Sequence, residues 1–156
     1  MFIFPSTSLL ADEFLSIKNH ISNYCLSPSG KARVMALVPG NDAEWIRLLL
    51  GKTNEFRRII SASENFPSEN YKDLDRELKL LRIENSVLQP EQALNILLVT
   101  KTIAAIDHFF KNNSERYPLL FSIMENVFYE KNISDEIEKV LDEFGVVKST
   151  ASPELM

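Results

Sequence analysis

Residues 89–112 read QPEQALNILLVTKTIAAIDHFFKN and contain the strongest structural signal in the sequence. Pro90 at the first helical position and Glu91 in the first turn are typical of a helix start. Apolar residues then recur at helical spacing, at Ile96, Val99, Ile103, Ile106 and Phe110. This pattern predicts one helix at about 90–112, roughly 34 Å long. Because most of its sides are apolar, we expect it to be central, packed by several neighbours.

The segments on either side of this helix predict shorter helices. They lie at about 9–25 (or from 16), 28–37, 41–62, 72–81, 117–128 and 134–144, with turn-rich residues between 61 and 70. The chain has only four glycines, which also favours helices. We therefore expect an all-α fold, a multi-helix orthogonal bundle around the long central helix. A chain of 156 residues fits a single domain over 1–156.

Local signals predict where the shorter helices begin. Ser27 precedes Pro28 as an N-cap, Asn41 forms a capping box with Glu44, and Ser134 caps the last helix. Gly145 is the expected stop of that last helix.

The apolar spacing also predicts which side chains of these helices face inward. They are Phe14, Ile17, Ile21 and Tyr24; Trp45, Leu49, Phe56 and Ile60; Leu74, Leu78 and Leu81; and Ile137, Val140, Leu141 and Phe144. Gly30, inside a first helical turn, indicates that another backbone passes close by.

The net charge of −5 creates no field that attracts phosphate backbones. The nearest basic cluster, Lys52, Arg57 and Arg58, lies beside Glu44 and Glu55 and is expected to be a solvated helix face. No apolar stretch reaches the roughly 18 uninterrupted residues of a membrane span, and residues 1–5 are too short for a secretory signal. We therefore expect a cytoplasmic protein without a membrane partner.

The sequence contains no recognisable catalytic, nucleotide-binding or metal-binding motif. The four glycines stand apart and form no phosphate loop, so an ATP site in this chain is not expected. His20 and His108 are too far apart in sequence to start a zinc site. The single cysteine, Cys25, has no partnering base and is expected to be buried and inert. The sequence thus predicts no catalytic, cofactor-binding or metal-ligating residue.

One helical face carries several acidic residues, and paired carboxylates can do acid–base chemistry. Asp135, Glu138 and Asp142 share a helical face at i, i+3 and i+7. This face lies opposite the apolar stripe, so we expect solvent to screen all three side chains equally.

The last residues look like the entrance of another helix, with Ser152 as N-cap, Pro153 at the first position and Glu154 in the first turn. Two interpretations follow. Either these residues are an idle tail, or the chain is a piece of a longer protein, truncated where a helix begins near 152.

Several segments resemble the core domain of MutS-family proteins of the type-two branch. They are CLSPSGK at 25–31, TNEF at 53–56, Phe66-Pro67, LKLLRIE at 78–84, Phe109-Phe110, Tyr117-Pro118, DEFGVV at 142–147 and ASPEL at 151–155. In that branch the last of these runs opens a long lever helix that heads toward a DNA clamp. The resemblance covers nearly the whole chain.

The resemblance implies that the parent protein is a dimeric, DNA-dependent ATPase of mismatch repair and recombination that lacks the mismatch-reading domain. This chain would be the N-terminal, non-catalytic part of its core, which seats the lever helices. ATP and Mg would bind beyond residue 156, and DNA would be held by other domains. The partners would be the rest of the polypeptide and a second copy of the parent.

Two other interpretations remain open. A free-standing helical adaptor that binds a partner protein through an apolar groove also fits an acidic chain without catalytic motifs. A small enzyme is the third, and no group of residues supports it.

Overall fold

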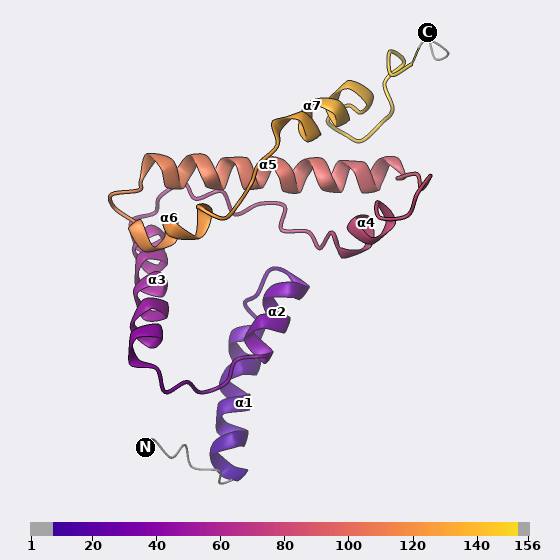
Figure 1. The fold of residues 1–156 in the computed structure, drawn as a ribbon. Coiled ribbons are helices and arrows are strands. Elements are labelled where there is room, and N and C mark those ends of the chain that lie inside the picture. The colour runs from indigo at the N-terminus through magenta and orange to yellow at the C-terminus, as the bar shows by residue number, and fades with distance from the viewer. Residues whose placement is uncertain (1–7, 153–156) are drawn as a thin grey trace. The chain divides into compact units, whose positions relative to one another are not determined.

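The computed structural model describes residues 8–152, with side chains from residue 12 onward. These residues form seven α-helices and no β-strand, which confirms the all-α prediction (Figure 1). The helices are α1 (Ser8–Ser22), α2 (Pro28–Met35), α3 (Ala43–Ser61), α4 (Asp75–Leu80), α5 (Pro90–Asn112), α6 (Pro118–Met124) and α7 (Lys131–Val140). The predicted helix entrance at Pro153 and Glu154 lies outside the described residues.

The chain divides into two compact units, residues 1–51 and residues 52–156, with the boundary inside α3. Each unit is held together by its own contacts. The expectation of one domain over residues 1–156 stays a prediction.

In the first unit, α1 packs against α2. The Lys18 ammonium donates to the carbonyl oxygens of Met35 at 2.8 Å and Leu37 at 3.3 Å. These carbonyls belong to the C-terminal end of α2, where a cation is favoured by the helix dipole. None of the described side chains of this unit is fully buried, and Ile17, Ile21 and Tyr24 of the predicted inward face are exposed.

The start of α2 confirms one sequence prediction and corrects another. Ser27 is the N-cap, and its hydroxyl oxygen accepts the N–H of Gly30 at 3.1 Å. A Cβ atom on Gly30 would lie 3.1 Å from that same oxygen. The close neighbour of Gly30 is therefore the capping side chain, not another backbone. Cys25, predicted to be buried, is half-buried.

The capping residue of α3 differs from the prediction by one position. The carboxylate of Asp42 accepts the N–H groups of Glu44 at 2.9 Å and Trp45 at 3.1 Å. Asp42 therefore caps the helix and the prediction of Asn41 was wrong. A carboxylate is the better partner here because it also interacts favourably with the positive end of the helix dipole.

In the second unit, the C-terminal half of α3 buries a different face from the predicted one. Ile59 is 1% exposed and Glu55 is 7% exposed, whereas Ile60 is 66% exposed. The inward face is thus rotated by one residue, about 100° on a helix. The prediction of Ile60 as an inward residue was wrong, because it excluded the acidic Glu55 from the buried face. Phe56 lies at the edge of that face.

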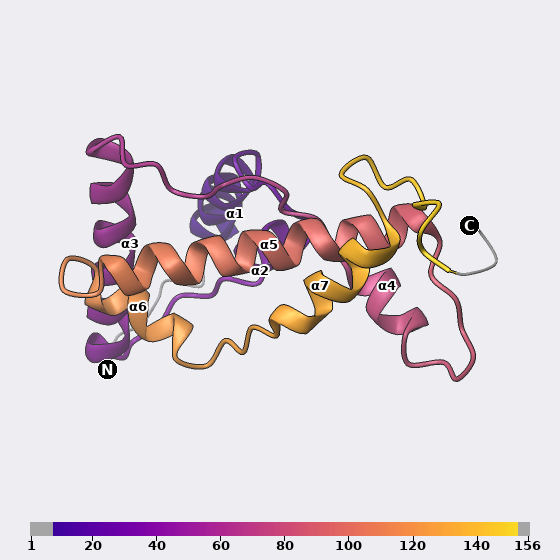
Figure 2. The same cartoon turned by 90° about the horizontal axis from the view of Figure 1, so that it is seen from above.

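Helix α5 runs from Pro90 to Asn112, as predicted. The side-chain oxygen of Gln92 accepts the N–H of Gln89 at 2.9 Å and closes the first turn. Figures 1 and 2 show α6 at the C-terminal end of α5, and α7 along its N-terminal half. Of the predicted stripe, Ile96 and Phe110 are buried, and Val99, Ile103 and Ile106 are half-buried.

By length and composition α5 could cross a membrane, a test that the core helix of a soluble protein also passes. Its polar side chains have protein partners. The Thr102 hydroxyl lies 3.1 Å from the carbonyl oxygen of Glu69, and the Lys101 ammonium lies 2.5 Å from the Glu138 carboxylate of α7. These partners are typical of a helix packed against protein. The expectation of no membrane partner stays a prediction.

The short helix α4 buries Glu77 instead of the leucines that the sequence pattern favours. Leu78 and Leu81 are exposed, so their assignment to the core was wrong. The side-chain nitrogen of Asn95 in α5 lies 3.5 Å from the Glu77 carboxylate.

Helix α7 begins and ends earlier than predicted. It starts at Lys131, so Ser134 is a buried residue within the helix and not its cap. It ends at Val140, five residues before Gly145, and Val140 and Phe144 are exposed although Leu141 is buried as predicted.

The early end of α7 follows from the turn chemistry of Asp142. Its carboxylate accepts the N–H groups of Phe144 at 2.9 Å and Val146 at 2.8 Å, so it stabilises a turn that competes with the helix. Leu141 and Val147 then pair as an antiparallel bridge around Gly145, which has a φ of +80°. Because Asp142 lies outside the helix, the predicted acidic face of Asp135, Glu138 and Asp142 does not exist.

The register of α3 can be tested with two neighbouring isoleucines. We expect Ile59→Ala to lower the free energy of unfolding by about 2–4 kcal/mol, because it leaves a cavity in the core. Ile60→Ala, the matched control, should change it by less than about 0.5 kcal/mol. Chemical denaturation of both variants gives the two values. The reverse order would contradict this register and restore the predicted one.

Candidate functional site

His20, His108 and Cys25 each contact a residue nearby in the sequence. The rings of His20 and Tyr24 lie 5.4 Å apart, and His108 Nε2 lies 2.9 Å from the side-chain nitrogen of Asn112. The Cys25 thiol points to the carbonyl oxygen of Ile21 at 3.7 Å. Among the described residues, no three His, Cys, Asp or Glu side chains come together as metal ligands do.

The buried carboxylate of Glu55 and the buried ring of Tyr117 lie where α3, the end of α5 and the start of α6 meet. We call this place the α3–α6 junction. Its residues are Glu55, Ile59, Glu64, Phe109, Phe110, Arg116, Tyr117 and Leu120. It is the candidate functional site of this chain.

The Glu55 carboxylate is the cap of α6. Its two oxygens accept the N–H of Leu119 at 3.2 Å and the N–H of Leu120 at 2.9 Å. Pro118 has no N–H, and the preceding residue Tyr117 gives no side-chain cap. A side chain 64 residues earlier in the sequence therefore satisfies the free donors at the start of α6. These charge-assisted bonds and the helix dipole offset the desolvation of the carboxylate.

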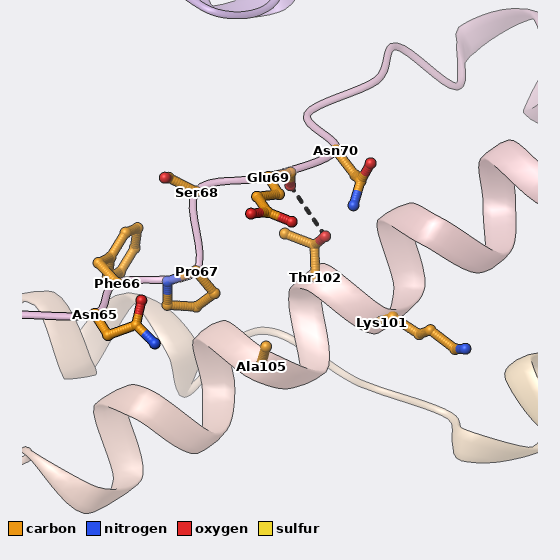
Figure 3. A pocket seen from close by; sticks show the side chains of 9 residues that line it. All are labelled: Asn65, Phe66, Pro67, Ser68, Glu69, Asn70, Lys101, Thr102 and Ala105. Atoms are coloured by element: carbon orange, nitrogen blue, oxygen red, sulfur yellow. Dashed lines mark hydrogen bonds between the residues drawn. The ribbon is translucent and has the colours of Figure 1, made fainter.

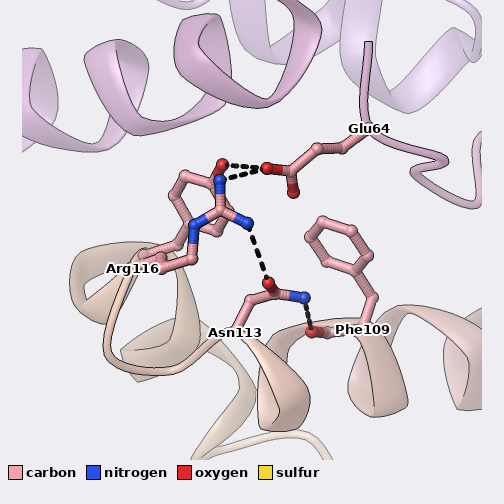
Figure 4. A network of polar contacts seen from close by, with 5 residues as sticks. Glu64, Phe109, Asn113 and Arg116 are labelled. Atoms are coloured by element: carbon pink, nitrogen blue, oxygen red, sulfur yellow. Dashed lines mark hydrogen bonds and ion pairs between the residues drawn. The ribbon is translucent and has the colours of Figure 1, made fainter. Parts of the chain in front are cut away.

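Tyr117 anchors the other side of the junction. It is 1% exposed, and its hydroxyl donates to Glu64 Oε1 at 2.8 Å. The Arg116 guanidinium lies 2.5 Å from the same oxygen (Figure 4). Burial, and then the hydrogen bond to Glu64, raise the pKa of the Tyr117 phenol above its ordinary value. The phenol therefore remains a neutral hydrogen-bond donor.

Asn113 connects this polar network to α5. Its side-chain nitrogen donates to the carbonyl oxygen of Phe109 at 2.9 Å, at the end of the helix (Figure 4). Its side-chain oxygen lies 3.4 Å from Arg116, in the turn between α5 and α6. The turn is thus fixed at both ends.

Aromatic rings fill the centre of the junction. The ring centroid of Phe66 lies 5.2 Å from those of Phe56 and Phe109, and its plane is nearly perpendicular to both. The rings of Phe109 and Tyr117 are nearly parallel, with centroids 6.4 Å apart. Edge-to-face and stacked pairs of this kind are favourable. The guanidinium of Arg58 lies 5.5 Å from the centre of the Tyr117 ring. Arg58 of the predicted solvated cluster thus covers a core tyrosine.

A shallow pocket of about 390 Å³ lies beside the junction, between residues 65–70 and α5 (Figure 3). The Thr102 hydroxyl of α5 donates to the carbonyl oxygen of Glu69 at 3.1 Å, and this bond holds the two walls of the pocket together. Lys101, which also lines the pocket, lowers the pKa of Glu138 through a hydrogen bond and its charge. These contacts hold segments together and place no activated nucleophile beside a base.

The sequence predicted no site residue, and the α3–α6 junction was missed. Two signals could have indicated it. Tyr117-Pro118 opens a helix without any Ser, Thr, Asp or Asn as cap, so an acceptor from elsewhere is required. Glu55 lies four residues before Ile59 and therefore shares its helix face. The arrangement can fix the directions of three chain segments.

Comparison with known proteins finds bacterial MutS2 endonucleases among the relatives of this chain. The chain is 25% identical over 129 residues to the endonuclease MutS2 of Pelotomaculum thermopropionicum, and 28% identical over 150 residues to that of Clostridium beijerinckii. It is 24% identical over 148 residues to the endonuclease MutS2 of Aquifex aeolicus. No protein-family model matches the chain, and no solved structure is significantly similar to it.

These alignments cover 83%, 95% and 95% of this chain but 16%, 19% and 19% of the relatives. The chain therefore spans less than a fifth of the length of the curated relatives it matches. The similarity supports a relationship to MutS2 proteins, in agreement with the resemblance seen in the sequence.

The α3–α6 junction predicts a strong effect of losing the Glu55 carboxylate. We expect Glu55→Ala to lower the free energy of unfolding by about 2–4 kcal/mol, because the buried N–H of Leu120 and the half-buried N–H of Leu119 lose their acceptor. Glu44→Ala removes an exposed acid from the first turn of the same helix and should lower it by no more than about 1 kcal/mol, the contribution of its interaction with the helix dipole. Equal effects of the two substitutions in urea denaturation would contradict the capping role.

Proposed function

We propose that this chain is the first part of the helical core of a MutS2-like protein. Its role is non-catalytic: it seats the lever helices that couple a distal ATPase to a DNA clamp. The observation that carries this proposal is the similarity to MutS2 proteins, which extends over 83–95% of the chain and 16–19% of three of the relatives. A chain that matches less than a fifth of its relatives would supply one part of a larger protein.

The packing of the second unit supports a mechanical role. Helix α5 is fixed at its C-terminal end by the α3–α6 junction and along its N-terminal half by α7. The Lys101–Glu138 ion pair joins α5 to α7 at 2.5 Å. A long helix held at both ends moves as one piece, since close-packed interiors transmit a displacement instead of absorbing it. Such a helix is a suitable base for levers.

The proposal places the chemistry of the parent outside this chain. ATP and Mg would be bound by a phosphate loop in a later domain, and the parent would act as a homodimer. DNA would be held by a clamp, and any cleavage of the kind named in the relatives would belong to another domain. The parent would work in the cytoplasm, in mismatch repair or in recombination.

A free-standing adaptor is the second candidate function. It is favoured by the exposed apolar side chains of the first unit, of which Ile17, Tyr24 and Trp45 are examples. Such side chains suit a surface that another protein covers. An adaptor would need no longer polypeptide around it, and this difference separates the two candidates.

The proposed function is tested by the gene and by the purified chain. We expect the reading frame to continue past codon 156 into a GxxxxGK[ST] phosphate loop. The 156-residue chain alone should hydrolyse no ATP and should bind duplex DNA only weakly, with an affinity that falls steeply as salt is added.

Two results would contradict the proposal. A natural stop codon directly after Met156 would favour the adaptor. Tight DNA binding by the chain alone that persists at high salt would show that these residues read DNA directly. Fluorescence anisotropy with a labelled duplex, measured over a salt series, distinguishes weak from direct binding.

A further inference from the structure

An apolar groove runs along the contact between α5 and α7. It has a volume of about 300 Å³, and we call it the α5–α7 groove. Apart from Glu136, its lining is apolar and includes Leu88, Pro90, Ala93, Ile137 and Val140. Val140 and Val147 are 41% and 42% exposed, although both lie beside the buried Leu141. A surface of this kind binds the apolar face of another helix well.

The segment that follows α7 passes along the wall of this groove. Val147 is part of the lining, and the next residue, Lys148, is clamped to α7. The Lys148 N–H donates to the carbonyl oxygen of Val140 at 2.8 Å, and its ammonium donates to the carbonyl oxygen of Glu138 at 2.6 Å. The position from which the chain continues is therefore fixed next to the groove.

The turn before Lys148 is fixed on α5 as well. A Cβ atom on Gly145 would lie 2.8 Å from Leu94 Cδ2, so the backbone of the turn packs directly on the helix. The φ of Gly145 is +80°, which also disfavours any side chain there. With contacts to both α5 and α7, the exit of the chain is held by two elements and cannot swing away without breaking both.

We infer that the α5–α7 groove is the docking site of an apolar helix face from the same polypeptide, in the part that follows residue 156. This inference rests on the proposed function, in which the chain continues into lever helices. A segment tethered about ten residues from the groove has an effective concentration in the millimolar range, far above that of a separate protein. The occupant is therefore a later segment of the same molecule, not a second copy.

The test compares cysteine labelling in the 156-residue chain and in the longer protein. Val147→Cys places a thiol in the groove, and Glu115→Cys places one on an exposed site at the other end of α5. Peptide mass spectrometry scores each site separately from Cys25. We expect the thiol at 147 to react at least about tenfold more slowly in the longer protein, and the thiol at 115 to react at similar rates in both.

A second substitution confirms that the groove is the cause of this protection. In the longer protein, Val140→Glu should restore fast labelling at 147, because docking would bury its charge. Val87→Glu introduces the same charge at an exposed apolar residue outside the groove and should leave the protection intact.

The outcomes separate the groove from the proposed function. Equal labelling at 147 in both proteins, with ATP hydrolysis by the longer one, overturns the groove assignment alone. A reading frame that stops after codon 156 overturns both. Protection at 147 in the 156-residue chain that rises with protein concentration overturns the assignment in favour of a second copy.

Discussion

The Glu55 carboxylate accepts the two N–H groups with which α6 begins, and the arrangement of the second unit depends on this contact. Pro118 opens the helix without a donor, and no local side chain caps it. The cap comes from α3 instead, so α6 cannot end up far from Glu55 without leaving buried N–H groups unpaired. A local requirement of one short helix thus joins segments that are distant in sequence.

The rest of the α3–α6 junction follows from this placement. With α6 fixed, Tyr117 is buried at its start, where Glu64 accepts its hydroxyl and Phe109 stacks on its ring. Both contacts draw the end of α5 toward α3. The long helix then carries α7 and the turn around Gly145 along its other half. Under the proposed function, such a base would give the lever helices a fixed point to move against.

The spacing of apolar residues in the sequence was sufficient to predict the long helix α5. Helix α5 was predicted at both ends, because its apolar residues recur over about four turns and Pro90 marks its start. The shorter helices were found, but their inward faces were often wrong. Apolar spacing cannot show that Glu55 or Glu77 is buried, since the reason lies in partners contributed by other segments.

Turn chemistry explains the remaining errors. Asp42 and Asp142 each accept two backbone N–H groups, and they decide where α3 begins and where the turn after α7 forms. The sequence offered Asn41 and Gly145 for these roles, and a single-residue choice between neighbours depends on backbone geometry. The candidate site was missed for a related reason: a cap supplied from 64 residues away leaves no local motif.

The capping of α6 by Glu55 can be measured through hydrogen exchange of the Leu120 amide in the native protein. If Glu55 caps α6 within a packed core, this amide should be protected by a factor of at least about 10³, an opening free energy of roughly 4 kcal/mol. The Gly30 amide, which is capped locally by Ser27 in a helix without buried residues, is the internal reference. Protection of Leu120 no greater than that of Gly30 would contradict the account.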